Sequence, residues 1–448
     1  MADLHELARL LKELDDQMAT CMKCGMCQAV CPLYAETGRE TDVARGKIAL
    51  VENLASEMLK DPKGVKERLD RCLLCGSCAA SCPSGVRVLD IFLKARAILA
   101  GYLGLSPAKK AIFRGMLARP RLMDTLLSSA SKLQGVFAKP VNETLGSSCA
   151  RFMSPLLGDR HFIPLAKKPW HKEHAAMNTP RGQSGLKVAF YPGCLVDKIF
   201  PRIARAVLRV MEHHEVGLFM PTNQVCCGIP ALSSGDRQTF QTLVQKNIDI
   251  FSSQDFDVLI TPCATCTSTI TKIWPLMADS FSGPVQNKIH VLADRTMDVN
   301  AFLVDKLHIS PAETDGQQRT RVTYHDPCHL RKSLDVVDQP RVVMQSNPAC
   351  DFQEMQDPDR CCGMGGSFNL LHYDLSKQVG DKKRQAILDS QAEVVCTGCP
   401  ACMMQISDLL SHAGRDIQVR HPIELYAQAL DASSQARQHS LTTQPPGK

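Results

Sequence analysis

Two copies of one cysteine pattern near the start of the chain constrain its fold more than any other feature. The pattern C-x-x-C-x-x-C-x-x-x-C-P occupies residues 21–32 and recurs, with every spacing unchanged, at residues 72–83. Cysteines this close together let one loop offer three thiolates to one metal centre, while the fourth cysteine, followed by proline, turns away. We therefore expect the chain to fold around metal here, with the fourth cysteine of each copy serving the centre of the other copy.

The spacing is the one that bacterial ferredoxins use to bind [4Fe-4S] clusters. A pair of zinc knuckles is the alternative, but zinc takes four ligands and would leave the remaining cysteines without a role. We therefore predict two [4Fe-4S] clusters with crossed fourth ligands. The predicted ligands are Cys21, Cys24, Cys27 and Cys82 for the first cluster, and Cys31, Cys72, Cys75 and Cys78 for the second.

The insert between the two copies has a helical pattern. Leu, Val and Ile recur at three-to-four spacing over residues 43–69, which predicts helix. With a helical insert, residues 1–100 are similar to the helical ferredoxin modules of respiratory dehydrogenases rather than to a compact two-cluster ferredoxin. The function implied for this domain is electron transfer.

The C-terminal part of the chain contains an internal repeat with an offset of about 135 residues. The first unit contains KVAFYPGC, CCGIPALSSGD and DVLITPCATC, and the second contains RVTYHDPC, CCGMGGSFN and EVVCTGCPAC. In both units a short β-branched run is followed by a cysteine-bearing turn and then by helical periodicity, which predicts a parallel sheet. Ligands in such sheets gather beyond the carboxyl ends of the strands, so we expect the cysteines to meet there.

Each unit, called a CCG module below, contributes one cysteine, a Cys-Cys-Gly sequence and a C-x-x-C pair. Aligning DVLITPCATC with EVVCTGCPAC places Cys396 on the strand, opposite Ile260, so the second pair is Cys399 and Cys402. Cys149, Cys350 and Cys396 fall outside every pattern and are expected to be core or surface thiols. The predicted metal ligands are Cys194, Cys226, Cys227, Cys263 and Cys266 in the first module, and Cys328, Cys361, Cys362, Cys399 and Cys402 in the second.

The spacing of these cysteines resembles that of the cysteine-rich CCG domain in the catalytic subunits of heterodisulfide reductases. In that family the five cysteines of a module hold an unusual [4Fe-4S] assembly, which implies one or two further [4Fe-4S]-type clusters here. A zinc ion, or an ordinary four-cysteine cluster with one spare thiol, stays open as an alternative.

The order of the whole chain, two ferredoxin runs and then two CCG modules, resembles the iron-sulfur subunit of glycolate oxidase and its lactate dehydrogenase relatives. It is also similar to the iron-sulfur subunit of anaerobic glycerol-3-phosphate dehydrogenase and to the fused subunit of heterodisulfide reductase. The resemblance implies the electron-transfer subunit of an oxidoreductase complex. Its partners would be an FAD-containing dehydrogenase subunit that oxidises lactate or glycolate, and a quinone or other electron carrier. Thiol and disulfide chemistry of the heterodisulfide reductase type, or the glycerol-3-phosphate role, are the alternatives.

No catalytic residue is predicted in this chain, because hydroxy-acid oxidation needs a hydride acceptor and the sequence has no flavin or nicotinamide fingerprint. His325 and His329 flank Cys328 and could tune the potential of a cluster or carry a proton. The plainer interpretation of both is a loop histidine bonded to backbone.

Charge and hydropathy limit where the protein is expected to be located and what it is expected to bind. The first residues lack the apolar core of a secretory signal, and no run of about 18 apolar residues is present, so we expect a cytoplasmic protein without a membrane span. Residues 101–170 hold eleven Lys and Arg against three Asp and Glu. This excess predicts contact with an acidic partner or peripheral contact with anionic lipid, a solvated basic face being the alternative. No nucleic-acid partner is expected, because the basic residues are not interleaved with aromatic ones.

We therefore predict an α+β multidomain fold, with a helical ferredoxin domain followed by two repeated α/β modules that contain small parallel sheets. The predicted divisions are a ferredoxin-type domain at 1–100, a basic helical or linker segment at 101–185, the first CCG module at 186–310, the second at 318–431, and a disordered tail at 432–448.

Overall fold

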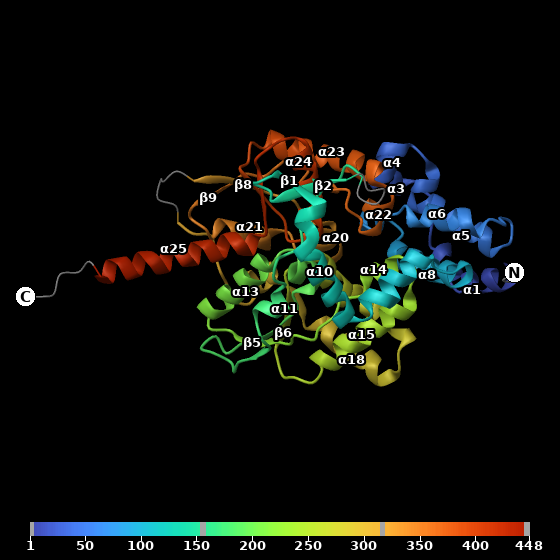
Figure 1. Cartoon of the computed structure of the whole chain (residues 1–448). Helices are drawn as coiled ribbons and strands as arrows, with labels where there is room; N and C mark the ends of the chain where they lie inside the picture. The colour runs from blue at the N-terminus through green and yellow to red at the C-terminus, as the bar shows by residue number, and fades with distance from the viewer. Residues whose placement is uncertain (1–3, 153–157, 314–318, 443–448) are drawn as a thin grey trace, which may run out of the picture.

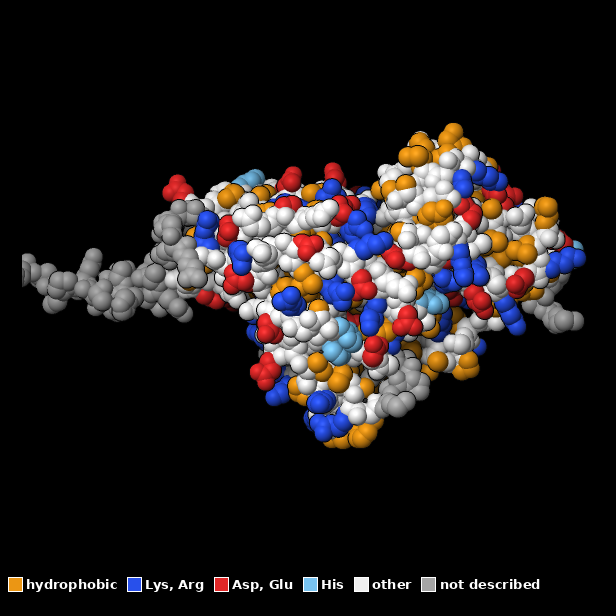
Figure 2. Space-filling model, turned by 90° about the horizontal axis from the view of Figure 1, so that it is seen from above, with side chains coloured by type: hydrophobic (Ala, Val, Ile, Leu, Met, Phe, Trp, Pro, Cys, Tyr) orange, Lys and Arg blue, Asp and Glu red, His pale blue; other side chains and the backbone are white. Residues whose placement is uncertain are grey.

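The computed structural model describes residues 4–152, 158–313 and 319–442. A helical N-terminal domain lies at one end of the molecule and contacts both of the α/β modules, which lie one above the other (Figure 1). The predicted α+β organisation is confirmed. Over the face drawn in Figure 2, acidic and basic side chains are interspersed, and apolar side chains gather in separate patches.

The N-terminal domain packs its helices around an apolar core that includes Leu7, Ile48, Val51 and Ile91. The predicted helical stretch is present as two helices, α5 and α6. The second begins where the Asp61 carboxylate accepts a hydrogen bond from the backbone of its first turn, next to a proline. The helices of this domain are α1 (Leu4–Lys12), α2 (Asp15–Ala19), α3 (Met26–Val30), α4 (Pro32–Thr37), η1 (Glu40–Asp42), α5 (Ala44–Ala55), α6 (Pro62–Asp70), α7 (Ser77–Ala80) and α8 (Val88–Leu103).

The first CCG module is built on a sheet with strand order β3-β5-β4-β6-β7, parallel except for the edge strand β3. Its strands are β3 (Met177–Asn178), β4 (Lys187–Phe190), β5 (Gly217–Met220), β6 (Val258–Thr261) and β7 (Thr296–Asp298), and its helices are α12 (Gly193–Lys198), α13 (Pro201–His213), α14 (Ile229–Ser233), α15 (Arg237–Phe251), α16 (Ala264–Ser268), η3 (Thr269–Ile273), α17 (Trp274–Leu276), η4 (Ala278–Ser280), α18 (Gly283–Asp294) and α19 (Val299–Asp305).

The second module repeats the topology, since its all-parallel sheet has the order β9-β8-β10-β11, which corresponds to β5-β4-β6-β7. The internal repeat of the sequence is thus a repeat of structure. Its elements are β8 (Thr320–Tyr324), α20 (Cys328–Leu334), α21 (Asp338–Gln345), β9 (Cys350–Phe352), α22 (Ser367–Leu371), α23 (Tyr373–Asp389), β10 (Val394–Cys396), α24 (Pro400–His412), β11 (Gln418–Arg420) and α25 (Pro422–Thr442).

The two modules share one hydrophobic core. Helix α25 of the second module packs against α13 of the first, and α16 packs against α20. A single cluster of buried residues contains Phe190 and Val207 from the first module and Val395 and Leu410 from the second. The two cysteine-bearing edges therefore face each other rather than opposite sides of the molecule.

The segment between the N-terminal domain and the first module is more ordered than a linker. The strand β3 pairs with β5, and the buried Trp170 anchors the chain just before it. The segment contains α9 (Pro107–Lys110), a π-helix η2 (Ala111–Leu117), α10 (Pro120–Phe137), the antiparallel pair β1 (Ala138–Asn142) and β2 (Ser147–Ala150), and α11 (Trp170–Glu173).

Helix α25 continues to Thr442, whereas the sequence predicted a disordered tail from residue 432. Residues 432–442 contain neither proline nor glycine, so they can extend a helix whose first turns are packed. Residues 443–448 lie outside the described part of the chain.

Candidate metal centres

The first cysteine run surrounds a small hollow in the N-terminal domain. Cys21, Cys24 and Cys27 line this hollow together with Cys82 from the second run. Cys78 of the second run also lines this hollow. The structure therefore brings together the four cysteines that the sequence assigned to the first cluster, including the crossed one.

The second N-terminal group forms around Cys31. Burial raises the pKa of the Cys31 thiol to about 11, and the neighbouring Cys72 and Cys75 contribute to the rise. Burial likewise raises the pKa of Cys78 well above its usual value, with Cys72, Cys75 and Cys31 as neighbours. Cys31 thus lies with the second run and not with its own, as crossed ligation requires; the ligand assignment itself stays a prediction.

The two runs adopt the same backbone conformation. The residue before the second cysteine has a positive φ in both loops, 57° at Lys23 and 54° at Leu74. Backbone N–H groups point at sulfur, since Leu74 donates to Cys72 Sγ at 3.5 Å and Val86 donates to Cys82 Sγ at 3.5 Å. Strained turns and N–H···S hydrogen bonds are typical of loops that wrap a cluster.

Two buried cations stand beside the second N-terminal group. Lys47 has no exposed surface, and burial lowers its pKa while the thiols of Cys72 and Cys31 oppose that change. Arg96 is also buried and donates hydrogen bonds to the carbonyls of Cys72, at 2.9 Å, and Ser233, at 2.8 Å. Positive charge held in a low-dielectric setting favours thiolates, which are the metal-binding form of cysteine.

The cysteines of the first CCG module follow the carboxyl ends of β4, β5 and β6, as predicted from the repeat. Hydrogen bonds from Cys226 and Cys266 hold the pKa of the Cys227 thiol well below its usual value. The backbone around the Cys-Cys-Gly sequence is fixed by buried side chains, since Trp274 Nε1 donates to Cys227 O at 2.9 Å and the Asn247 amide donates to Cys226 O at 3.2 Å.

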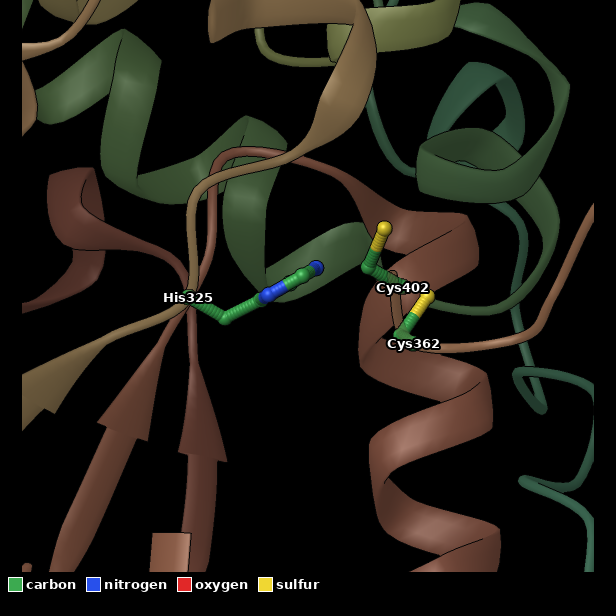
Figure 3. A group of neighbouring side chains, drawn as sticks. All are labelled: His325, Cys362 and Cys402. Atoms are coloured by element: carbon green, nitrogen blue, oxygen red, sulfur yellow. The ribbon is translucent and has the colours of Figure 1, made fainter. Parts of the chain in front are cut away.

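The cysteines of the second module occupy the same positions after β8, β9 and β10. A hydrogen bond from Cys402 holds the pKa of Cys362 well below its usual value in spite of burial. Cys328 and Cys361 lie at the outer side of this group, where burial raises the pKa of both thiols. The side chain of His325 also lies beside these cysteines. One of its ring nitrogens and the sulfurs of Cys362 and Cys402 all lie within 4.8 Å of one another (Figure 3).

The two CCG groups touch each other. Hydrogen bonds from two thiols hold the pKa of Cys399 well below its usual value. The larger effect comes from Cys263 of the first module, and the smaller from Cys402. The backbone joins the same two loops, since Ala264 N–H donates to Gly398 O at 3.0 Å. Each thiol acts on the pKa of the next in an unbroken row, in the order Cys194, Cys226, Cys227, Cys266, Cys263, Cys399, Cys402 and Cys362.

One end of this thiol row meets the second N-terminal group. Cys75 is a close neighbour of both Cys328 and Cys361 and contributes to their raised pKa values. Leu73 of the same loop packs in a small core with Phe368 of the second module. Lys332 Nζ also donates to Ser77 Oγ at 2.7 Å, so the loop is fastened to this module by polar and apolar contacts.

The other end of the thiol row opens into a pocket of about 670 Å³, to which Cys194 and Cys226 contribute. Lys198, in the pocket wall, forms ion pairs with Asp197 at 2.7 Å and with Asp124. His171 bonds Asp197 at 2.9 Å. Burial alone would raise the pKa of Asp197, but the His171 hydrogen bond and the Lys198 charge hold it below its usual value.

The three cysteines outside the patterns lie away from the thiol row. Cys396 is buried in β10 and packs with Cys350 in a separate apolar cluster. Burial raises the pKa of Cys350 to about 11. Cys149, in β2, is half-buried. All 21 cysteines fall within the described part of the chain, and the structure contains none of them in a disulfide.

The donor set fits iron-sulfur clusters better than oxygen-seeking cations. Soft thiolates converge at each site, whereas Mg²⁺ and Ca²⁺ require several oxygen ligands. Burial raises the pKa of thiols such as Cys328 and Cys361, and a metal that replaces their protons removes this cost of ionisation. His325 is the nitrogen donor that lies with Cys362 and Cys402. His325 was named from the sequence, but its contact with these two cysteines was not predicted.

Comparison with known protein families agrees with this geometry. A model of the 4Fe-4S dicluster domain matches residues 17–86, and a model of the cysteine-rich CCG domain matches twice, at residues 188–271 and 322–407. Within the described residues, no helix has the length and apolar character that crossing a membrane requires.

The chain is similar to several curated proteins over most of its length. It is 28% identical over 430 residues to a probable glycolate oxidase iron-sulfur subunit of Bacillus subtilis, covering 93% of this chain and 95% of that one. It is 28% identical to a subunit of the fumarate reductase (CoM/CoB) of Methanothermobacter marburgensis, over 90% of this chain and 71% of the relative. A lactate utilization protein A 2 of Bacillus cereus matches at 28% over 55% of this chain and its own entire length.

Proposed function

We propose that this chain, an iron-sulfur protein with one 4Fe-4S dicluster domain and two cysteine-rich CCG domains, is the electron-transfer subunit of a flavin-linked 2-hydroxy-acid dehydrogenase. The substrate of the complex would be lactate or glycolate, oxidised by an FAD-containing partner subunit. The similarity to a glycolate oxidase iron-sulfur subunit and to lactate utilization proteins supports this choice.

The observation that carries the proposal is the continuity of the cysteine sites. The second N-terminal group adjoins Cys361, and the thiol row then runs without a gap to Cys194 at the pocket. Bound iron-sulfur clusters accept and release one electron at a time, which suits a partner flavin that returns electrons in pairs. The ligand sets that we propose are those predicted from the sequence.

Contacts between the domains would fix the positions of the proposed clusters relative to one another. Arg96 fastens α8 to the first module through Ser233 O, while Lys332 fastens the second N-terminal loop to the second module. Both contacts fix the separation between sites on different domains. Most of the CCG thiols are buried, whereas Cys194, Cys328 and Cys361 are half-buried, and Cys194 lines the pocket.

We propose that the pocket is where electrons pass between this chain and a small carrier, such as a quinone. The pocket offers apolar walls together with the Lys198–Asp197–His171 network, a combination able to receive a ring and to bond its oxygens. It is also the place where a thiol of the row meets solvent-accessible space.

The first residues of helix α10 line this pocket, and the helix turns a polar face toward the protein. Its inner face is held by polar contacts, because Asp124 pairs with Lys198, and Lys172 Nζ donates to Ser128 Oγ at 2.7 Å. Gln134 exchanges two hydrogen bonds with the Leu165 backbone, each 3.0 Å long. Several apolar residues of the helix face outwards, namely Leu122, Leu126, Leu133, Val136 and Phe137, which are between 42% and 60% exposed, whereas Met123 lines the pocket.

We propose that this outer face of α10 binds an anionic lipid surface and so brings the pocket close to a pool of apolar carriers. Exposed Arg119, Arg121 and Lys132 accompany the apolar stripe, and each basic residue near such a surface contributes about 1 kcal/mol. An acidic protein partner would use the same basic residues.

Vesicle sedimentation tests the lipid contact. The chain should bind vesicles rich in phosphatidylglycerol more tightly than phosphatidylcholine vesicles, and binding should weaken with salt. The double variant Leu126→Glu, Leu133→Glu should lose binding, whereas glutamates at Leu370 and Leu371, also exposed but distant in sequence, should not. Equal binding by both double variants would reject the α10 face, and salt-sensitive capture of the partner subunit without lipid binding would favour the protein contact.

Reconstitution tests the function itself. The purified chain with its clusters rebuilt should show no lactate- or glycolate-dependent dye reduction until the FAD-containing subunit is added. Cys399→Ala, in the middle of the thiol row, should slow reduction of a quinone acceptor while the N-terminal clusters are still reduced. Cys396→Ala is the matched control, since that thiol is equally buried but outside the row. Substrate oxidation by the chain alone would overturn the proposal.

A second candidate function is reductive cleavage of a disulfide at the CCG sites, as in the heterodisulfide reductases that the sequence resembles. The pocket beside Cys194 favours it, because a disulfide substrate needs access to a cysteine site. Efficient reduction of a disulfide by the reconstituted chain with an artificial electron donor, without lactate or glycolate turnover in the presence of the flavoprotein, would favour this candidate.

A further inference from the structure

The second CCG module contains a nitrogen donor that the first module lacks. We propose that Nε2 of His325 is a metal ligand, bound to the same centre as the thiolates of Cys362 and Cys402. The inference rests on the proposal that this module holds a metal centre, and it adds a residue of another type to the all-cysteine ligand set.

The position of His325 is fixed by the fold. It follows β8, and its backbone N–H donates to Cys396 O on the neighbouring strand at 2.9 Å. Its side chain is buried, with 1% of its surface exposed. The ring points from the end of the strand toward Cys362 and Cys402, and the donor atoms of the three residues lie within 4.8 Å of one another (Figure 3). A small movement of these side chains would bring all three to bonding distance of one metal ion.

The hydrogen bonds of the ring determine which nitrogen is available. Nδ1 lies 3.3 Å from the carbonyl oxygen of Pro358, and a carbonyl can only accept, so Nδ1 carries the proton. Nε2 then carries the lone pair. It is buried without a nitrogen or oxygen partner, and the group beside the ring is the Cys362 thiol, whose pKa Cys402 and then His325 lower. Metal-binding histidines commonly donate the other ring N–H to a backbone carbonyl in this way.

The Pro358 carbonyl is itself held in place. Lys383 Nζ donates to Pro358 O at 3.0 Å and to Asp357 O at 2.7 Å, which fixes the loop that orients the imidazole. The loop therefore sets both the tautomer of His325 and the direction of its lone pair. A loop histidine whose only role was to bond backbone would have no need to aim its second nitrogen at two sulfurs.

The first module provides an internal comparison. Tyr191 occupies the position of His325, and its hydroxyl donates to Val225 O at 2.5 Å, so the phenol is already engaged. The first site would then be bound by sulfur alone and the second by sulfur and nitrogen. Replacing thiolate by neutral imidazole raises the reduction potential of iron-sulfur centres, so the second site should be the more easily reduced of the two.

His329 is the matched control within the same module. It lies four residues further along the chain, in α20, and its Nδ1 lies 3.1 Å from Thr265 Oγ1. It is near the thiol row without belonging to the group of donors that contains His325. Its removal should leave the second site's nitrogen ligand unchanged.

Pulsed electron paramagnetic resonance of the full-length chain tests the proposal. The protein is grown with ¹⁵N-labelled histidine, reconstituted with iron and sulfide, and reduced. We expect a directly coupled ¹⁵N nucleus in the wild-type spectrum, its loss in His325→Ala and its retention in His329→Ala. Absence of that coupling from the wild-type spectrum, or its persistence in His325→Ala, would overturn the inference without any reference to enzyme activity.

A measurement of metal content distinguishes a failure of this inference from a failure of the proposed metal centre on which it rests. If Cys362→Ala keeps the full wild-type metal content, the second module holds no centre at that position and both ideas fail. If Cys362→Ala loses metal but labelled histidine shows no coupling, only the ligand role of His325 fails. Should zinc occupy the site, a nitrogen scatterer in its X-ray absorption spectrum that disappears in His325→Ala supports the same role. The labelled wild-type protein answers the question even if the alanine variant does not fold.

Discussion

Substituting alanine for Gly363, the glycine of the second Cys-Cys-Gly sequence, should destabilise the second module through two additive effects. Gly363 has φ +90°, a conformation that residues with a Cβ rarely adopt. The added Cβ would also stand 2.2 Å from the carbonyl oxygen of Ser376. That oxygen belongs to the backbone of α23, and Ser376 is fixed because its hydroxyl donates to Gly363 O at 2.8 Å.

The magnitude follows from treating the two effects separately. A positive φ costs an L-residue about 1–2 kcal/mol, and forcing atoms into a closely packed site costs about 1–3 kcal/mol. Gly363→Ala should therefore lower the free energy of unfolding by about 2–5 kcal/mol. Gly414→Ala, in the same module, is the matched control, because Gly414 has φ +63° and nothing within 4 Å of its added Cβ, so only the backbone effect applies.

Urea unfolding followed by circular dichroism measures the difference, with iron content as a second readout. Gly363→Ala should unfold at a clearly lower urea concentration than Gly414→Ala, and its reconstituted form should contain less iron. Gly228→Ala in the first module should fall between them, since its Cβ would meet the Phe240 ring at 2.7 Å and a side chain yields more easily than backbone. Equal midpoints for Gly363→Ala and Gly414→Ala would refute the steric argument.

Three further outcomes are expected. Cys31→Ser should weaken the second N-terminal cluster and spare the first, as read by electron paramagnetic resonance; loss of the first instead would contradict crossed ligation. Cys399→Ala should lower the iron content of the reconstituted chain while Cys396→Ala leaves it nearly intact, and equal losses would contradict the strand alignment. Arg96→Met leaves several buried carbonyls without a donor and should lower the free energy of unfolding by about 3 kcal/mol or more in a denaturant titration. Arg87→Met, at an exposed site, should have little effect on the same measurement.

The sequence predicted the features that depend on local spacing. The two cysteine runs fix which thiols share a loop, and the alternation of β-branched runs with helical periodicity predicted strands whose carboxyl ends bear cysteines. The choice of Cys399 over Cys396 as the second-module candidate follows from one aligned strand, and the structure places Cys399 in the thiol row and Cys396 in an apolar cluster.

Features that depend on packing between distant segments were not predicted. Nothing in the local sequence says that Cys263 and Cys399 touch, because their contact arises from the shared core of the two modules. The approach of His325 to Cys362 depends equally on the Pro358 loop, which comes from a different part of the module. The helix through residue 442 was missed because polar composition was taken as disorder, although such residues continue a helix once its first turns are packed.

The shared core also places two similar modules in different surroundings. The two similar sheets carry five cysteines each at matching positions, so the arrangement of these cysteines is common to both modules. What surrounds each site is not duplicated, since the N-terminal domain reaches Cys328 and Cys361 in one module while α10 and the pocket reach Cys194 in the other. A path with distinct ends requires this kind of asymmetry. Under the proposal that His325 binds metal, its presence where the first module has Tyr191 extends the same asymmetry to the donor set.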